Sequence, residues 1–362
     1  MAESVVLYVN STTKLCRYLG LFPFYLSNEG QLIVSKLWST WAVLVLTVFT
    51  CSSTYSLFAF EVKSTSALSV ILNYFELFIF LILICAHLIW IFVNKKLLEV
   101  SFRPLLTLEL ELIKPSLWPP CLAYLGIFGL TVMQCLMFPS IKHIYVSIVD
   151  YTQTAFAFAV IFQFTDLLQI YRQAFIKLAN SCRKCEEVGY VAFSRLKKPF
   201  LLRQFELNEE VVDCCETLSY CFGPALLIMI LSSFIIISSS LFAVYDFWSD
   251  KTEVSVSCVW IVLYLCQFRH LVNACENSSA AANQFYSSLL QAVTKDNQLS
   301  NDHTFGLLLM MRKILKLTAF GYFFIDYGIF CSMLAASVTY FVVFIEFNHN
   351  ASERKAGPTD LI

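Results

Sequence analysis

Seven long apolar stretches limit what this chain can fold into. They cover residues 37–60, 67–93, 121–138, 146–171, 217–245, 256–274 and 318–347. A helix needs about 20 mostly apolar residues to cross a bilayer. Because lipid offers no hydrogen-bond partners, a spanning backbone must satisfy its own polar groups, as a helix does. The sequence therefore predicts an all-α membrane protein with seven transmembrane helices, named S1 to S7 in chain order.

The composition supports a chain that faces lipid. Of its 362 residues, 58% are hydrophobic and only 14% are charged, whereas a soluble domain is about a quarter charged. The net charge of −1 gives no general positive field for nucleic acid. We therefore expect a multi-pass protein of the plasma membrane, with the lipid bilayer as a partner and no nucleic-acid partner.

The distribution of Lys and Arg predicts the orientation. If the N-terminus is cytoplasmic, 20 of the 25 Lys and Arg residues fall on the cytoplasmic side, counting Arg269 near the inner end of S6, as the positive-inside rule requires. The C-terminus is then extracellular, which argues against G-protein-coupled receptors, whose N-terminus lies outside. The expected segments are a cytoplasmic N-terminus (1–36), S1–S4 (37–171), a cytoplasmic S4–S5 region (172–216), S5–S6 (217–274), a cytoplasmic loop and helix (275–317), S7 (318–347) and an extracellular tail (348–362).

Two cytoplasmic segments have the pattern of amphipathic helices. Residues 201–216 and 304–317 mix apolar and charged side chains at helical spacing. Their charges are of both signs, which favours packing against protein over binding to a membrane surface. We therefore expect cytoplasmic helical extensions of the spanning helices.

The 14 cysteines do not have the pattern of a disulfide framework, because most lie in apolar runs or in segments placed in the cytoplasm. Cys182 and Cys185 form one CxxC pair, but no second pair or nearby His pair completes a metal site. The sequence contains no HExxH, GxSxG or P-loop motif. We expect no enzyme, no metal and no cofactor.

One motif in S7 is specific. Residues 339–347 (TYFVVFIEF) resemble the TYhhhhhQF signature of insect gustatory receptors, in which h is apolar. The motif residues are Thr339, Tyr340, Glu346 and Phe347, and Glu346 stands where Gln is usual. Residues 222–227 (FGPALL) resemble the start of S5 in gustatory and odorant receptors, and residues 19–23 (LGLFP) resemble their segment before S1. The length and the expected topology match along the whole chain.

This resemblance implies a subunit of a ligand-gated, non-selective cation channel that detects small tastants. It implies a homo- or hetero-tetramer with other receptor subunits, in which S7 lines the pore and the cytoplasmic ends of S4–S7 form an anchor. The sugar-receptor branch tends to have Glu where this chain has Phe341, so a bitter or other non-sugar compound is expected. A membrane transporter, or a seven-helix chemoreceptor that signals without its own pore, remains an alternative.

A helical projection of S7 separates small and bulky side chains. One face carries Ser332, Ala335, Ala336, Thr339, Val343 and Glu346, and the other carries Phe330, Leu334, Val338, Phe341 and Ile345. A small face suits a close helix contact or a pore. With the motif, we expect the pore-lining residues to be Ser332, Ala336, Thr339, Val343, Glu346 and Phe347. Glu346 would attract cations and Phe347 would form an apolar gate; interfacial positions are the alternative for both side chains.

Polar and aromatic side chains at similar depth predict a ligand pocket. Glu76 is an ionisable group within S2, and such groups usually face a cavity or a partner. The expected ligand-binding residues are Tyr74, Glu76, Gln134, Tyr151, Gln153, Thr154, Trp260 and Tyr264. An aromatic box with a few polar groups suits a small organic ligand, and polar bridging between packed helices is the alternative. His87 on S2 is expected to be a hydrogen-bonded core histidine.

Overall fold

The computed structural model describes residues 16, 18–22, 24–26, 32–59, 67–108, 118–137, 141–187 and 194–355. Its main helices are α3 (Lys36–Ala59), α4 (Ala67–Val93), α5 (Lys95–Thr107), α6 (Trp118–Met137), α7 (Ile141–Glu187), α8 (Ser194–Asp246), α9 (Lys251–Thr294) and α12 (Tyr327–Lys355). Each predicted stretch lies on one of these helices, S7 starting later than expected. The prediction of an all-α fold is confirmed.

Several of these helices have the properties of membrane spans. By length and composition, α3, α7, α8, α9 and α12 can each cross a bilayer. Helix α4 passes the same test together with α5, which is bent 70° from it, and α6 offers a shorter apolar segment, Pro120–Leu136. The fold thus supplies five spans within its described residues, or six if the bent pair counts as one.

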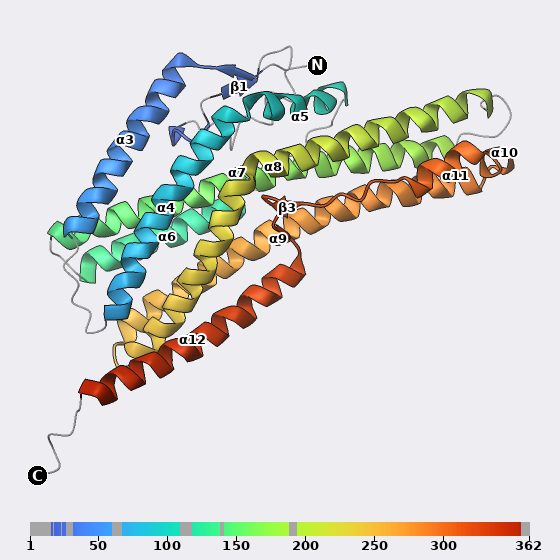
Figure 1. Cartoon of the computed structure of the whole chain (residues 1–362). Coiled ribbons are helices and arrows are strands. Elements are labelled where there is room, and N and C mark those ends of the chain that lie inside the picture. Colours follow the sequence, from blue (N-terminus) through green and yellow to red (C-terminus); the bar gives the residue numbers. More distant parts are fainter. Residues whose placement is uncertain are drawn as a thin grey trace, which may run out of the picture.

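The helices form a bundle that continues into a long arm (Figure 1). The bundle contains α3, α4, α6 and α12, and parts of α7, α8 and α9 extend beyond it to make the arm. The short helices α10 (Asn297–Ser300) and α11 (His303–Met310) lie at the far end of the arm. The long α8 agrees with the expected helical extension over residues 201–216.

Helices α7 and α9 run side by side in the same direction. The Arg183 Nε donates to Ser288 Oγ over 3.1 Å, and Ser278 Oγ donates to the Leu168 carbonyl over 3.4 Å. The sequence separations of these pairs, 105 and 110 residues, are nearly equal. A constant separation identifies a parallel pair, so the two helices stay in contact from the bundle into the arm.

Helix α8 contains a proline where it enters the bundle. Pro224 has no N–H, so the carbonyl of Tyr220, four residues earlier, receives no helical hydrogen bond. The Trp90 indole nitrogen on α4 donates to that carbonyl over 3.2 Å. Interior prolines kink helices, and α8 changes direction as it passes from the arm into the bundle (Figure 1). The motif at residues 222–227 thus marks a bend in α8.

The predicted start of S7 at residue 318 is wrong. Residues 318–324 form an antiparallel hairpin of β3 (Thr318–Ala319) and β4 (Phe323–Phe324), and α12 starts at Tyr327. Phe320 and Gly321 have φ angles of 54° and 80°, which no right-handed helix contains. Asp326 then accepts the Ile329 backbone N–H at 2.9 Å, an N-cap that fixes the helix start.

Two further boundaries differ from the prediction. The expected helix over residues 304–317 stops at Met310, and residues 311–317 have no regular helical structure. At the other end, α12 continues past Phe347 to Lys355, so the expected tail begins as helix. The first difference arises because backbone N–H groups after Met310 bond to carboxylates on α8, as described below.

The segment before α3 contains a second small hairpin. Strands β1 (Phe24–Leu26) and β2 (Leu32–Val34) pair antiparallel. Gly20 precedes them with a φ of 74°, and a Cβ there would lie 3.2 Å from the Ala42 Cα. Only glycine combines this left-handed turn with so close an approach to α3. This explains the glycine of the motif at residues 19–23.

Candidate pore face and ligand site

One side of α12 packs against the bundle through aromatic rings. Its ring contacts, given as centroid distances, are Phe330 with Phe268 at 5.5 Å, Tyr340 with Phe234 at 5.3 Å, Phe344 with Phe242 at 6.0 Å and Phe341 with Tyr245 at 6.4 Å. Met333 and Ser337 are buried on the same side. Rings are rigid and bulky, so these contacts set how α12 is rotated about its axis.

The predicted small face of α12 points away from this packing. Ser332, Ala335, Thr339 and Glu346 are exposed, Ala336 and Val343 are half-buried, and Phe347 is 68% exposed. The Thr339 hydroxyl donates to the Ala335 carbonyl over 3.0 Å, within its own helix. Among the described residues, no hydrogen bond or ring contact links this face to another helix. A second chain, lipid or water can therefore cover this face.

The predicted bulky face needs one correction. Val338 belongs to the predicted bulky face with Phe330 and Phe341, but unlike them it has no ring contact and is 56% exposed. The packed side is instead centred on Met333, Ser337 and Phe344, because the rings of α8 and α9 meet α12 there. The small face and the surface around Val338 are thus both unpacked.

The charge on the spanning part of α12 is confined to one residue. Between residues 327 and 347 the sequence has no Lys, Arg or Asp, and Glu346 is its only Glu. Glu346 is exposed on the small face, one residue before the exposed Phe347. Glu346 is thus the one acidic side chain on this part of α12.

Three of the predicted ligand-binding residues come together as stacked rings. Tyr151 on α7 stacks on Trp260 of α9, with ring centroids 5.2 Å apart and planes at 18°. Trp260 in turn lies 5.8 Å from Tyr264, which meets Phe158 edge-on at 5.5 Å. Tyr151 and Tyr264 are buried, whereas Trp260 is half-buried. The rings fill the space between α7 and α9, so a ligand here would have to displace Trp260.

The predicted amides lie elsewhere. Gln153 Nε2 on α7 donates to Ser53 Oγ on α3 over 2.6 Å, and Gln134 Oε1 on α6 accepts the Ser147 hydroxyl at 3.2 Å. Thr154 is fully buried. Both amides therefore bridge neighbouring helices and do not join the ring stack. This agrees with the alternative to a ligand role, polar bridging between packed helices.

The remaining predicted positions on α4 divide into two groups. Tyr74 and Glu76 belong to α4, but their side chains lie outside the described part of the structure. His87 is buried as expected, yet neither ring nitrogen has a hydrogen-bond partner within the described residues, so the expectation of a hydrogen-bonded histidine is wrong. Its imidazole lies 5.5 Å from the Phe222 ring instead.

An apolar pocket opens at a different place. It lies between the segment before α3 and helices α3, α4 and α7, and it is lined by Leu19, Gly20, Leu21, Ala42, Val45, Leu46, Phe49, Ile84, Leu88 and Phe156. Apolar side chains alone give it little means to orient a polar ligand. The ring stack therefore remains the stronger ligand-site candidate.

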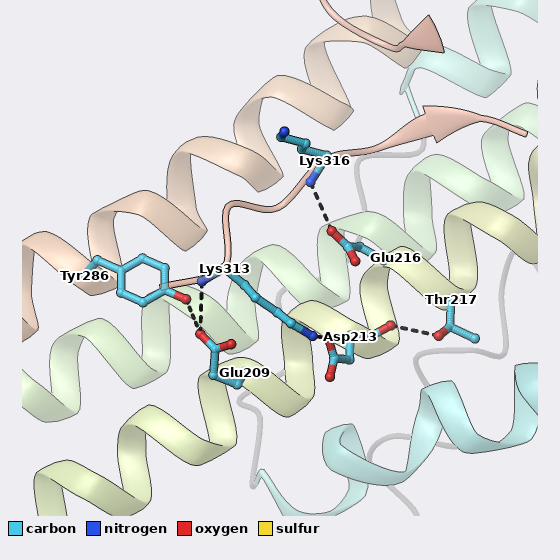
Figure 2. A network of polar contacts seen from close by, with 7 residues as sticks. All are labelled: Glu209, Asp213, Glu216, Thr217, Tyr286, Lys313 and Lys316. Carbon is cyan, nitrogen blue, oxygen red and sulfur yellow. Dashed lines mark hydrogen bonds and ion pairs between the residues drawn. The ribbon is translucent and has the colours of Figure 1, made fainter. Parts of the chain in front are cut away.

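Sequence reasoning missed two sets of residues. Ser53 and Phe158 complete the contacts of Gln153 and Tyr264, but neither stands out in an apolar run. Glu209, Asp213 and Glu216 on α8 contact the segment after α11 (Figure 2). Their spacing of four and three residues places them on one helix face, which is a signal that the sequence does contain.

A bundle of apolar helices, five of which are long and apolar enough to cross a bilayer, has the architecture of a polytopic membrane protein. The sequence profile described as "7tm Chemosensory receptor" matches residues 9–350. The chain therefore belongs to this chemosensory receptor family and is a multi-pass membrane protein.

Individual relatives agree with this family. The chain is 28% identical over 103 residues to gustatory receptor 68a of Drosophila melanogaster. That match covers 27% of this chain and spans about a quarter (26%) of the receptor's length. The fold resembles the olfactory receptor OR5 of Machilis hrabei, with a TM-score of 0.71, 13% identity, and coverage of 96% of this chain and 99% of that one. The structure of OR5 in complex with eugenol matches with a TM-score of 0.69 and 14% identity over the same shares of both chains.

Proposed function

We propose that the chain is a subunit of a ligand-gated, non-selective cation channel that detects small tastants at the plasma membrane. The observation that carries this proposal is the small, partly polar and unpacked face of α12, with its single carboxylate at Glu346. Membership of the chemosensory receptor family supports a sensory role.

The pore is formed by several copies of α12. A lone helix cannot enclose a water-filled path, so the small faces of α12 from four subunits, of this chain alone or with other receptors, surround it. Ser332, Ala336, Thr339 and Val343 line this path, and Glu346 and Phe347 stand at its mouth. Small side chains leave room for ions, and a ring of carboxylates favours cations.

The orientation places the arm in the cytoplasm. The bias of 20 among 25 Lys and Arg residues supports a cytoplasmic N-terminus. In Figure 1, β1 and the end of α12 lie at opposite ends of the bundle, which agrees with termini on opposite sides of the membrane. Glu346 then lies toward the extracellular end of the pore.

The ligand binds at the ring stack of Tyr151, Trp260 and Tyr264. The half-buried Trp260 is the ring that can move, and its displacement opens a box with two tyrosines as walls. The receptor solved with eugenol supports a small organic molecule as ligand. Phe341, which stands where sugar receptors tend to have Glu, favours a bitter or other non-sugar compound.

A cysteine scan of α12 tests the proposed pore. Cys331 is exposed, so the background carries Cys331→Ala. Currents evoked by a chemical panel are recorded from cells expressing the chain alone and with other receptors. A charged thiol reagent should block current through Ser332→Cys and Thr339→Cys. The matched control is Val338→Cys, which is exposed on another part of the same helix. Equal block at all three positions would contradict the pore face, and saturable flux without unitary currents would indicate a transporter.

A further inference from the structure

Three carboxylates on α8 lie along the segment that leads into α12 and contact it. Glu209, Asp213 and Glu216 form what we call the carboxylate row, and residues 311–317, between α11 and β3, form the strap. Figure 2 shows the row facing the strap. The Lys313 backbone N–H donates to Glu209 Oε1 over 3.5 Å, and its ammonium contacts Asp213. The Lys316 backbone N–H donates to Glu216 Oε1 over 3.4 Å.

The strap and the following hairpin cover about the same length as the stretch of α8 that they contact. An extended chain rises about 3.3 Å per residue and a helix about 1.5 Å. From Glu209 to Gly223, α8 advances about 21 Å, and from Lys313 to Phe320 an extended chain advances about 23 Å. The contacts occur in matching order: Glu209 with Lys313, Glu216 with Lys316, Ser219 with Thr318 and Gly223 with Phe320. The strap therefore lies along one face of α8 and continues into the hairpin.

The row supplies acceptors that an extended segment lacks. Backbone N–H groups outside helices and sheets still need partners, and a carboxylate is a strong acceptor. The hydrogen bond to Asp213 raises the pKa of Lys313, and the charges of Glu209 and Glu216 add to this. Glu209 is also held from the other side, because the Tyr286 hydroxyl on α9 donates to it. The row thus joins the strap to two arm helices.

Strength alone does not explain these contacts. The side chains of Lys313 and Asp213 are 51% and 54% exposed, and ion pairs in such surroundings contribute little to stability. The place of these contacts in the fold suggests a role other than stability. The hairpin that follows the strap touches α8 at Gly223, beside the bend at Pro224, and α12 starts only three residues after β4.

We propose that the carboxylate row positions the strap along α8, so that a movement of α8 about its bend is passed through the hairpin to the start of α12. The transmission to a gate rests on the proposed channel function, whereas the positioning of the strap does not. The three carboxylates act through the strap and touch neither the pore nor the ligand.

Trypsin cleavage in permeabilised membranes tests the positioning. Arg312, Lys313 and Lys316 are exposed cleavage sites within the strap. Replacing the row by alanine, which favours helix, should leave α8 formed and speed cleavage in the strap about tenfold, because the hydrogen bonds from Lys313 and Lys316 to the carboxylates are lost and the segment opens more often. The control is Glu206→Gln, which removes the exposed partner of Arg203 on the same helix (3.3 Å). If the triple variant is poorly expressed, Asp213→Asn gives the same comparison with shape retained.

The outcomes separate the two proposals. Equal cleavage of the parent, the row variant and the control would overturn the positioning, whether or not the parent conducts. A protected strap in a parent without ligand-evoked current would contradict the channel and leave the positioning intact. Where the parent does conduct, the row variant should shift the half-maximal ligand concentration or the ligand-free current several-fold. An unchanged concentration dependence together with faster cleavage would contradict the transmission.

Discussion

The Gly223→Ala substitution should destabilise the contact between α8 and the β3–β4 hairpin. A Cβ at this position would lie 3.0 Å from the Phe320 Cα, 3.1 Å from its Cδ2 and 3.1 Å from its backbone N. Carbon atoms in favourable contact are about 3.5–4.0 Å apart, so the hairpin must shift. Overpacking of this kind costs about 1–3 kcal/mol, and the gain in helix propensity offsets about 0.5–1 kcal/mol of it.

A matched glycine isolates the packing cost. A Cβ on Gly129, in α6, would meet no atom within 4 Å, so Gly129→Ala should show only the gain in propensity. The gain in helix propensity is the same in both variants, so their free energies of unfolding should differ by the packing cost alone, about 1–3 kcal/mol. In thermal unfolding of the purified protein, Gly223→Ala should melt at least about 1 °C below Gly129→Ala. Phe320→Ala should not rescue it, because two of the three close atoms are backbone. Equal melting temperatures would refute the close approach.

Three further changes test other parts of the account. Trp90→Phe removes the donor to the Tyr220 carbonyl that Pro224 leaves free, which should cost about 1–3 kcal/mol in the same unfolding assay; no loss would show that water replaces the indole. Tyr151→Ala should shift the half-maximal ligand concentration about 5- to 150-fold at normal surface expression, and an identical dose–response curve would exclude the ring stack. Tags at the two termini should label intact cells only at the C-terminus, and surface labelling at the N-terminus would contradict the proposed orientation.

The helices could be predicted from the sequence because lipid leaves so few choices. Apolar length alone located α4 at residues 67–93, as the structure has it. The start of α12 could not be found in this way, since the apolar residues Phe323, Phe324 and Ile325 extend the apolar run of the helix that follows. Only the positive φ of Phe320 and Gly321 and the cap at Asp326 separate them. Residues 311–317 have helical periodicity, yet carboxylates far away in sequence draw their backbone out of a helix.

The candidate site, like the fold, could be predicted from the sequence only in part. The small face of α12 follows from helical periodicity, and the structure leaves that face unpacked. Depth along a helix grouped Tyr151 with Gln153, but two residues along a helix is a turn of about 200°. Tyr151 therefore meets Trp260 on α9 while Gln153 meets Ser53 on α3. Rotation about the axis, which depends on every neighbour, decides the contacts.

The most direct test of the channel is the current through Glu346→Gln in excised patches. Four carboxylates about 8 Å apart, at an effective dielectric constant of about 20, repel by roughly 2 kcal/mol per neighbouring pair. Bound cations or protons relieve that repulsion, so divalent ions and external acid should both reduce the monovalent current of the parent. Glu346→Gln should still conduct cations, with weaker block by acid and a lower calcium permeability. Unitary currents with identical calcium permeability and acid block in both proteins would place Glu346 outside the permeation path and contradict the proposed pore face.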